Sequence, residues 1–436
     1  MYYNFIFRIL FIVSINFLFA SNNKSTPVGD VLHFKDGSTV SGLIIEHILG
    51  QSIEIEVNNK RLTFQISDIQ KITKGCHQEK EAELWGRCFD VSTTTTLNYN
   101  STWILRDDAD MLHGQVPDEI GKLINLEFLN LAANDFTSLP ESIGNLIKLK
   151  ELKLGRNDIK FLPESFGKLE SLEILYLGWN GLTHLPDSFG NLSNLKELYL
   201  PVNSLDSLPA SFCNLKKLEY LGLPSNSLDK LPEDIGNLVS LEHLGLNANS
   251  IKRLPDSIVN LTKLTYLSID ANHIKYLPEN IGNMKSLETL SVGAGFFFSN
   301  DLQEIPESIG NLKKLKYLNF SKNDLISLPS TIGGLENLEK LILYNNDLTS
   351  IPDEIGQLLK IEEINLSNNN LRSIPRTIHN LSNLNILDLS RNRISKISID
   401  LCSIPSIDKI DLSNNNLCAE YLFDCINYKD NQNCRD

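Results

Sequence analysis

The segment LEILYLGWNGLTHLPDSFGNLSN, residues 172–194, contains the pattern that decides the fold. Its first eleven residues read L-x-x-L-x-L-x-x-N-x-L, and this pattern opens at thirteen positions along the chain. The opening residues are Leu126, Leu149, Leu172, Leu195, Leu218, Leu241, Leu264, Leu287, Leu315, Leu338, Ile361, Leu384 and Ile407. Eleven of the twelve steps are 23 residues, and the step from Leu287 to Leu315 is 28. The chain is therefore an array of repeated units with one insertion of five residues.

Each position of the repeat has a physical role. The apolar first, fourth and sixth residues alternate as in a short strand with one buried face. The invariant Asn can satisfy backbone groups where the chain leaves the strand. A Pro such as Pro140 favours a first helical turn, which a Gly soon ends. The repeat is identified as a leucine-rich repeat, which implies an α/β solenoid with a curved parallel sheet and short helical or 3-10 segments on the convex side.

Two segments of different character precede the array. Residues 1–20 carry Arg8, an apolar stretch from Ile9 to Phe19 and the small residue Ala20, a pattern typical of a secretory signal peptide. Residues 30–74 alternate short apolar runs with turn pairs such as Asp36-Gly37, which predicts a small all-β domain. The run F-K-D-G-S-T-V-S-G in this segment resembles the opening of Sm-like or SH3-like barrels.

The cysteines gather at the two ends of the array, which is typical of disulfide-stiffened caps in an exported protein. We assign residues 76–125 to an N-terminal cap with a degenerate first repeat, residues 126–417 to the array, and residues 418–436 to a C-terminal cap. A Cys76–Cys88 bridge is predicted in the first cap. In the last, repeat register favours Cys402 with Cys425, which leaves Cys418 with Cys434. Cys213 stands in a column that is mostly Gly and is interpreted as a small buried residue.

The cap segments E-L-W-G-R-C-F, residues 83–89, and L-H-G-Q-V-P-D-E-I-G-K-L, residues 112–123, carry a second resemblance. They resemble the N-terminal cap and first repeat of plant-type extracellular leucine-rich repeat proteins, and exported bacterial proteins look similar. The resemblance also implies an alternative bridge between Cys418 and Cys425. It implies binding of peptides, proteins, glycans or small hormones, so it does not name a ligand.

Aromatic residues recur on the predicted concave face or at its rim, where exposed Tyr and Trp commonly dominate binding. These candidate ligand-binding residues are Phe128, Tyr176, Trp179, Tyr199, Tyr220, Tyr266, Tyr317 and Tyr344. The competing interpretation is that the tyrosines only stack on one another and suit strand conformation.

The insertion places Phe296, Phe297 and Phe298 on a loop, where they either pack over the distorted coil or grip a partner or membrane surface. Farther along, Asn365, Asp388 and Asp411 share one outward column. A rigid sheet offers too few oxygens for calcium, so we expect a solvated polar face there.

Charge and motifs narrow the function. The net charge of −14 argues against a nucleic-acid partner. No catalytic or metal-binding motif occurs, so we expect no enzyme activity, cofactor or metal. The sequence favours a secreted or cell-envelope scaffold that binds a protein, peptide or glycan, without a transmembrane span in the mature chain. The alternative is a structural or adhesive envelope component tethered through the N-terminal β-domain. The oligomeric state is left open.

Overall fold

The structure, a computed structural model, describes residues 30–35, 39–48, 52–57, 60–74, 80–100, 112–293, 299–398, 400–417 and 432. The segment 1–20, Cys76, Phe296, Phe297, Phe298, Cys418, Cys425 and Cys434 lie outside these residues. The chain divides into two compact units, Met1–Thr93 and Thr94–Asp436.

The first unit contains the predicted β-domain. Its elements are β1 (Asp30–Phe34), β2 (Thr39–Ile48), β3 (Ser52–Val57), β4 (Lys60–Gln65), the 3-10 turn η1 (Ile66–Asp68) and β5 (Ile69–Lys74). They form one antiparallel sheet in the order β4-β3-β2-β1-β5, with β4 and β5 at its edges. Leu32, Phe34 and Ile53 are buried in its core, against Phe64 and Ile69. The hairpin of β6 (Glu81–Leu84) and β7 (Arg87–Asp90) belongs to the same unit.

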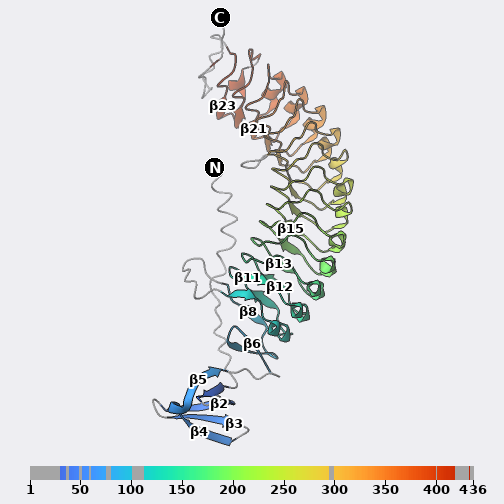
Figure 1. The fold of residues 1–436 in the computed structure, drawn as a ribbon. Helices are drawn as coiled ribbons and strands as arrows, with labels where there is room; N and C mark the ends of the chain where they lie inside the picture. The colour runs from blue at the N-terminus through green and yellow to red at the C-terminus, as the bar shows by residue number, and fades with distance from the viewer. Residues whose placement is uncertain are drawn as a thin grey trace. The chain divides into compact units, whose positions relative to one another are not determined.

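The second unit is one curved parallel sheet of fourteen strands, with short 3-10 helices on its outer side (Figure 1). Its strands are β8 (Thr96–Asn98), β10 (Phe128–Asn130), β12 (Glu151–Lys153), β13 (Ile174–Tyr176), β14 (Glu197–Tyr199), β15 (Tyr220–Gly222), β16 (His243–Gly245), β17 (Tyr266–Ser268), β18 (Thr289–Ser291), β19 (Tyr317–Asn319), β20 (Lys340–Ile342), β21 (Glu363–Asn365), β22 (Ile386–Asp388) and β23 (Lys409–Asp411). The predicted solenoid is confirmed. Strand β8, within the predicted N-terminal cap, adds one strand to the thirteen of the repeats. A separate small parallel pair joins β9 (His113–Gln115) to β11 (Asp135–Ser138).

The outer segments are 3-10 helices of three or five residues. They are η3 (Asp118–Lys122), η4 (Glu141–Asn145), η5 (Glu164–Lys168), η6 (Asp187–Asn191), η7 (Ala210–Asn214), η8 (Ile235–Asn237), η9 (Asp256–Asn260), η10 (Ile281–Asn283), η11 (Glu307–Asn311), η12 (Ser330–Gly334), η13 (Asp353–Gln357), η14 (Arg376–Asn380) and η15 (Leu401–Ser403). Most of them follow a proline in extended conformation, such as Pro140 with φ −76° and ψ 157°. The apolar columns between sheet and helices are buried, and residues such as Leu175 and Phe189 are fully inaccessible.

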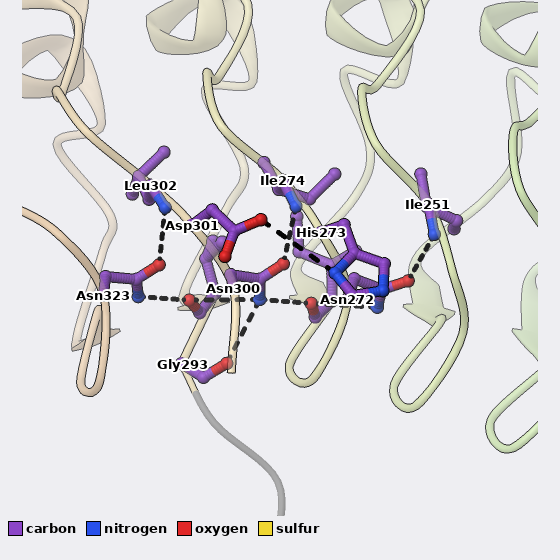
Figure 2. Close-up of polar contacts among 11 residues, drawn as sticks. Ile251, Asn272, His273, Ile274, Gly293, Asn300, Asp301, Leu302 and Asn323 are labelled. Carbon is purple, nitrogen blue, oxygen red and sulfur yellow. Dashed lines mark hydrogen bonds and ion pairs between the residues drawn. The ribbon is translucent and has the colours of Figure 1, made fainter. Parts of the chain in front are cut away.

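A ladder of Asn side chains ties successive coils together (Figure 2). Asn272 is fully buried; its Nδ2 donates to the carbonyls of Leu246 (3.0 Å) and Ile269 (3.1 Å), and its Oδ1 accepts from the Ile251 amide at 3.0 Å. Asn300, just after the insertion, keeps the same bonding, because its Oδ1 accepts from the Ile274 amide at 2.9 Å. The insertion therefore leaves the ladder continuous.

Gln432 extends this ladder past the last Asn. Its Oε1 accepts from the Leu417 amide at 3.0 Å, and its Nε2 donates to the Leu412 carbonyl at 2.8 Å. Asn415 makes the equivalent bonds one coil earlier, to the Ile394 amide and the Leu389 carbonyl. A glutamine from the C-terminal cap thus acts as the Asn of a further coil.

The length of each 3-10 helix follows from the residue in the Gly column of the coil before it. At Gly190, an added Cβ would lie 2.1 Å from the Ser211 carbonyl oxygen of the next coil, and the helix there, η7, has five residues. Cys213 and Val259 occupy the same column, and the helices that follow them, η8 and η10, have only three residues. A side chain in this column therefore pushes away the first part of the next outer turn.

Candidate functional site

Five stacked rings form the most distinctive surface of the array. We call Tyr176, Tyr199, Tyr220, His243 and Tyr266 the ring ladder; they occupy outward positions on the successive strands β13 to β17. From first to last, the ring centroids are 4.5, 4.4, 4.2 and 4.2 Å apart, with interplanar angles of 11°, 28°, 15° and 6°. Each aromatic contact of this kind contributes about 0.5–1.5 kcal/mol beyond simple burial. The ladder is thus a preorganised surface.

The ladder changes column in its middle because glycine makes room. Tyr176 and Tyr199 are the third residues of their strands, whereas Tyr220 is the first residue of β15. Gly222 lies directly across from Tyr199, and a Cβ at Gly222 would come within 3.1 Å of the Tyr220 ring. The absent side chain lets the Tyr220 ring lean across to Tyr199.

The ladder ends differently on its two sides. At its start, the Lys153 ammonium lies 5.4 Å from the Tyr176 ring centroid and pairs with Glu151 at 2.8 Å. At its end, Thr289 follows Tyr266 in the same column and interrupts the run of rings. Because each internal ring stacks on two neighbours, both faces of Tyr199, Tyr220 and His243 are occupied, and a partner would meet ring edges and hydroxyl groups.

The ladder is uncharged at neutral pH, and burial widens the pH range over which its side chains stay neutral. It raises the pKa of Tyr176, Tyr220 and Tyr266. The pKa of Tyr199 is raised by burial and also by the hydrogen bond that its hydroxyl donates to Glu197 Oε2 at 2.9 Å. Burial also lowers the pKa of His243 from 6.5 to about 4, and its Nδ1 is enclosed without a hydrogen-bond partner.

Replacing His243 with phenylalanine should remove an acid-dependent loss of stability. The folded protein holds His243 neutral at pH values where the unfolded chain protonates it. The contribution of His243 to the free energy of unfolding is therefore fully present above pH 6.5 and is lost as the pH falls toward 4. A depression of this size corresponds to about 2–3 kcal/mol over that range. The measurement is the difference in unfolding free energy between wild type and H243F from pH 7 to pH 4. The exposed His184→Phe is the control, and a difference for H243F that does not change with pH contradicts the prediction.

The other predicted aromatics lie outside the ladder. Trp179 is 55% exposed, adopts the left-handed conformation with φ 59°, and has the Arg156 guanidinium 5.4 Å from its ring centroid. Phe128 is the first residue of β10, and the Lys153 ammonium lies 5.4 Å from its ring centroid. Tyr317 lies beyond Thr289 on β19, and Tyr344 follows β20. The tyrosines from Tyr176 to Tyr266 do stack, as the competing interpretation expected.

The acidic column near the C-terminus makes local hydrogen bonds. The Oδ1 atoms of Asn365, Asp388 and Asp411 each accept from the amide and hydroxyl of the serine two residues later, at 2.7 to 3.0 Å. Within the described part of the chain, no group of three His, Cys, Asp or Glu residues is placed to hold a metal ion.

A second polar cluster lies next to the insertion. Asp270 accepts from the hydroxyls of Ser268 (2.8 Å) and Ser291 (2.6 Å) and from the Gly293 amide at 2.6 Å. Burial raises the pKa of Asp270, and these three hydrogen bonds oppose the shift. The cluster fixes the residue from which the insertion leaves the sheet.

The described cysteines are Cys88, Cys213 and Cys402. Cys88 and Cys402 are disulfide-bonded, but the predicted partners lie outside the described residues, so the pairings stay predictions. Cys213 is a free cysteine, 3% exposed.

Sequence reasoning missed several residues of the site. His243 is not part of the pattern of Phe, Tyr and Trp residues, although it stands in the same column as Tyr220 and Tyr266. The role of Gly222 could not be predicted from the sequence, because it depends on the Tyr220 ring that lies over this glycine.

Comparisons with known proteins agree with this architecture. A model described as a leucine-rich repeat region matches residues 105–208 and 203–302, and one described as a leucine rich repeat matches residues 336–392 and 360–417. No curated protein matches the chain. None of the helices in the described residues is long and apolar enough to cross a membrane.

Solved structures of bacterial and plant proteins are similar to the chain. A leucine-rich repeat protein of Leptospira interrogans is 33% identical, with 70% of this chain and 85% of that one covered and a TM-score of 0.57. An internalin from Listeria monocytogenes is 26% identical, and the match covers 76% of this chain and 91% of the internalin with a TM-score of 0.62. The plant peptide hormone receptor RGFR1, solved in complex with RGF2, is 28% identical, and the match covers 74% of this chain and 59% of the receptor chain with a TM-score of 0.58. The chain belongs to the leucine-rich repeat family.

Proposed function

We propose that this chain is an exported, non-enzymatic binding scaffold that captures a peptide or an extended segment of a protein on its concave face. The observation that carries the proposal is the ring ladder, Tyr176 to Tyr266, on five successive strands. Leucine-rich repeat proteins are typically scaffolds that bind peptides or proteins, and one similar structure is a plant peptide hormone receptor. Export rests on the signal-like segment 1–20 and on the cysteine-rich ends of the array.

The arrangement of the rings favours a peptide over a glycan. A sugar ring packs on an open aromatic face, but both faces of each internal ring of the ladder are covered by the neighbouring rings. Ring edges carry partial positive charge and suit the carbonyl oxygens of a peptide backbone. Because the rings are already ordered, a partner does not have to immobilise them on binding, which lowers the entropic cost of association.

Alanine at Tyr199 should weaken peptide capture about tenfold or more, because this substitution removes a central ring and breaks two stacking contacts. The probe is a random dodecapeptide display library selected on the full chain, followed by affinity measurement of the enriched peptides. Trp179→Ala tests the rim at little cost to folding, since Ala133, Ala248 and Ala271 adopt the same backbone conformation at equivalent positions.

Tyr276→Ala is the matched control, because Tyr276 is 52% exposed and lies between β17 and η10, outside the ladder. The control variant should bind as wild type, and each variant is first checked for an unchanged unfolding transition. Enriched peptides that bind Tyr199→Ala as tightly as wild type contradict the proposal. Peptides that instead depend on the N-terminal β-domain would favour the tethered envelope component.

A further inference from the structure

The ring ladder ends at Tyr266 with one ring face on which no other ring stacks. His243 stacks on the opposite face, with ring centroids 4.2 Å apart and an interplanar angle of 6°. Because the two rings are parallel, the outer face of Tyr266 points along the sheet, toward the next strand, β18. Among the described residues, no ring stacks on this outer face and no cation lies over it. The other end differs, since the Lys153 ammonium lies over the Tyr176 ring.

The column of rings is interrupted for one coil at β18. The two outward residues of this strand are Thr289 and Ser291, and neither carries a ring. Thr289 pairs in register with Tyr266 on one side and with Tyr317 on the other. We call the position of Thr289 and Ser291, between these two tyrosines, the ladder gap. The side chains of the ladder gap reach less far from the sheet than a phenol ring, so they leave the outer part of the Tyr266 face uncovered.

The width of the ladder gap matches one aromatic ring. Neighbouring strands lie about 4.8 Å apart, so the two steps from Tyr266 over Thr289 to Tyr317 span about 9.6 Å. A ring placed above Thr289 would therefore lie about 4.8 Å from the Tyr266 ring, and aromatic pairs prefer centroid separations of about 4.5–7 Å. The rings of the ladder are themselves 4.2 to 4.5 Å apart. An inserted ring thus continues the stack by one step.

Hydrogen bonds within the protein fix the floor of the ladder gap. The Ser291 hydroxyl donates to Asp270 at 2.6 Å and accepts from the Asn319 Nδ2 at 3.0 Å. The single O–H of Ser291 is therefore used, and the side chain is only 5% exposed. A ligand in the gap is consequently recognised by the face of Tyr266 rather than by a hydrogen bond from Ser291. A sugar ring needs partners for its hydroxyl groups, so this floor suits an aromatic side chain better.

We propose that the ladder gap receives one aromatic side chain, Phe, Tyr or Trp, of an extended peptide partner, which stacks on the outer face of Tyr266 above Thr289. This inference rests on the proposed function and specifies one side chain of its ligand. The stack with His243 holds the Tyr266 ring in place before the partner arrives, so the receiving face is preorganised. Leucine fills a similar volume but cannot stack, and the site therefore distinguishes the two kinds of apolar side chain.

The test selects the same dodecapeptide library on three full-length proteins: wild type, Thr289→Phe and Ile386→Phe. Thr289→Phe supplies a ring from the protein itself and closes the ladder gap. Ile386→Phe is the matched control, because Ile386 stands in the same column on β22, outside the ladder. Peptides enriched on wild type should share a Phe, Tyr or Trp. Replacing it with Leu should weaken binding to wild type and to the control about three- to tenfold, but to Thr289→Phe less than about twofold.

Tyr266→Leu provides a second test that does not depend on the folding of Thr289→Phe. It removes the stacking face and keeps an apolar side chain, so the cost of the aromatic-to-Leu change in the peptide should again fall below about twofold. Each variant is first checked for an unchanged unfolding transition.

The outcomes separate this inference from the proposed function. Enriched peptides without an aromatic residue, or an aromatic-to-Leu cost that is the same on all of these proteins, overturn the inference. Aromatic peptides that are enriched on the alanine variant of Phe296, Phe297 and Phe298 but not on wild type also overturn it, because the gap would then belong to the chain's own insertion. If the enriched peptides still lose binding to Tyr199→Ala, the ladder remains a peptide site and only its preference for an aromatic side chain is wrong. If no enriched peptide depends on Tyr199, the proposed function is wrong as well.

Discussion

Replacing Asn272 with alanine is expected to lower the free energy of unfolding by about 3–5 kcal/mol. The side chain is fully buried and makes four hydrogen bonds, to the Leu246, Ile269 and Asp270 carbonyls and from the Ile251 amide. Alanine would leave the buried Ile251 amide without a partner, which costs about 1–3 kcal/mol. The three carbonyls would each lose one hydrogen bond, worth about 1 kcal/mol, and keep another, from Asn249, Asn300 and the Ala248 amide.

The control for this substitution is Asn383→Ala. Asn383 also bonds across coils, from its Nδ2 to the Leu359 carbonyl at 2.7 Å, but its side chain is exposed. Water can replace that bond, so we expect a loss of about 1 kcal/mol or less. Denaturant unfolding of both variants provides the comparison. Equal losses would show that the buried ladder is not what holds the coils together.

Replacing Gly190 with valine is expected to cost about 2–4 kcal/mol and to shorten η7 from five residues to three. The added Cβ would lie 2.1 Å from the Ser211 oxygen and 2.5 Å from its carbonyl carbon, which are backbone atoms that cannot rotate away. The chain shows the consequence at Val259, after which η10 has three residues.

Cys213→Val is the matched control, because the coil after Cys213 has already adopted the shorter helix η8. It should change the unfolding free energy by about 1 kcal/mol or less, since the side chains are similar in volume. Unfolding free energies measure the cost, and a crystal structure of Gly190→Val shows the helix length. A five-residue η7 in that variant would contradict the steric explanation.

The fold could be predicted from the sequence because the same local pattern recurs thirteen times. Leu175, Asn180 and Pro186 each have a role that depends on their own coil and its immediate neighbours, so spacing alone was enough to predict it. The same locality explains why the small antiparallel β-domain could be recognised from its alternating strands and turn pairs.

The site could be predicted only in part, because it depends on relations between coils. Outward positions for Tyr176, Tyr199, Tyr220 and Tyr266 followed from strand alternation. The column change at Gly222 and the inclusion of His243 depend on which side chains meet across neighbouring strands. Likewise, the bonds of Gln432 to Leu417 and Leu412 come from a cap that does not follow the repeat rule.

Photo-crosslinking of an enriched peptide tests the central claim, that the ring ladder is a peptide-binding surface, most directly. A benzophenone placed at successive positions of the peptide is activated on the full chain, and the linked residues are identified by mass spectrometry. We predict crosslinks between Leu172 and Asp270 on the strand side of the coils, and their loss in Tyr199→Ala. Crosslinks that fall on the outer 3-10 helices or within residues 30–93, and that persist in this variant, would contradict the claim.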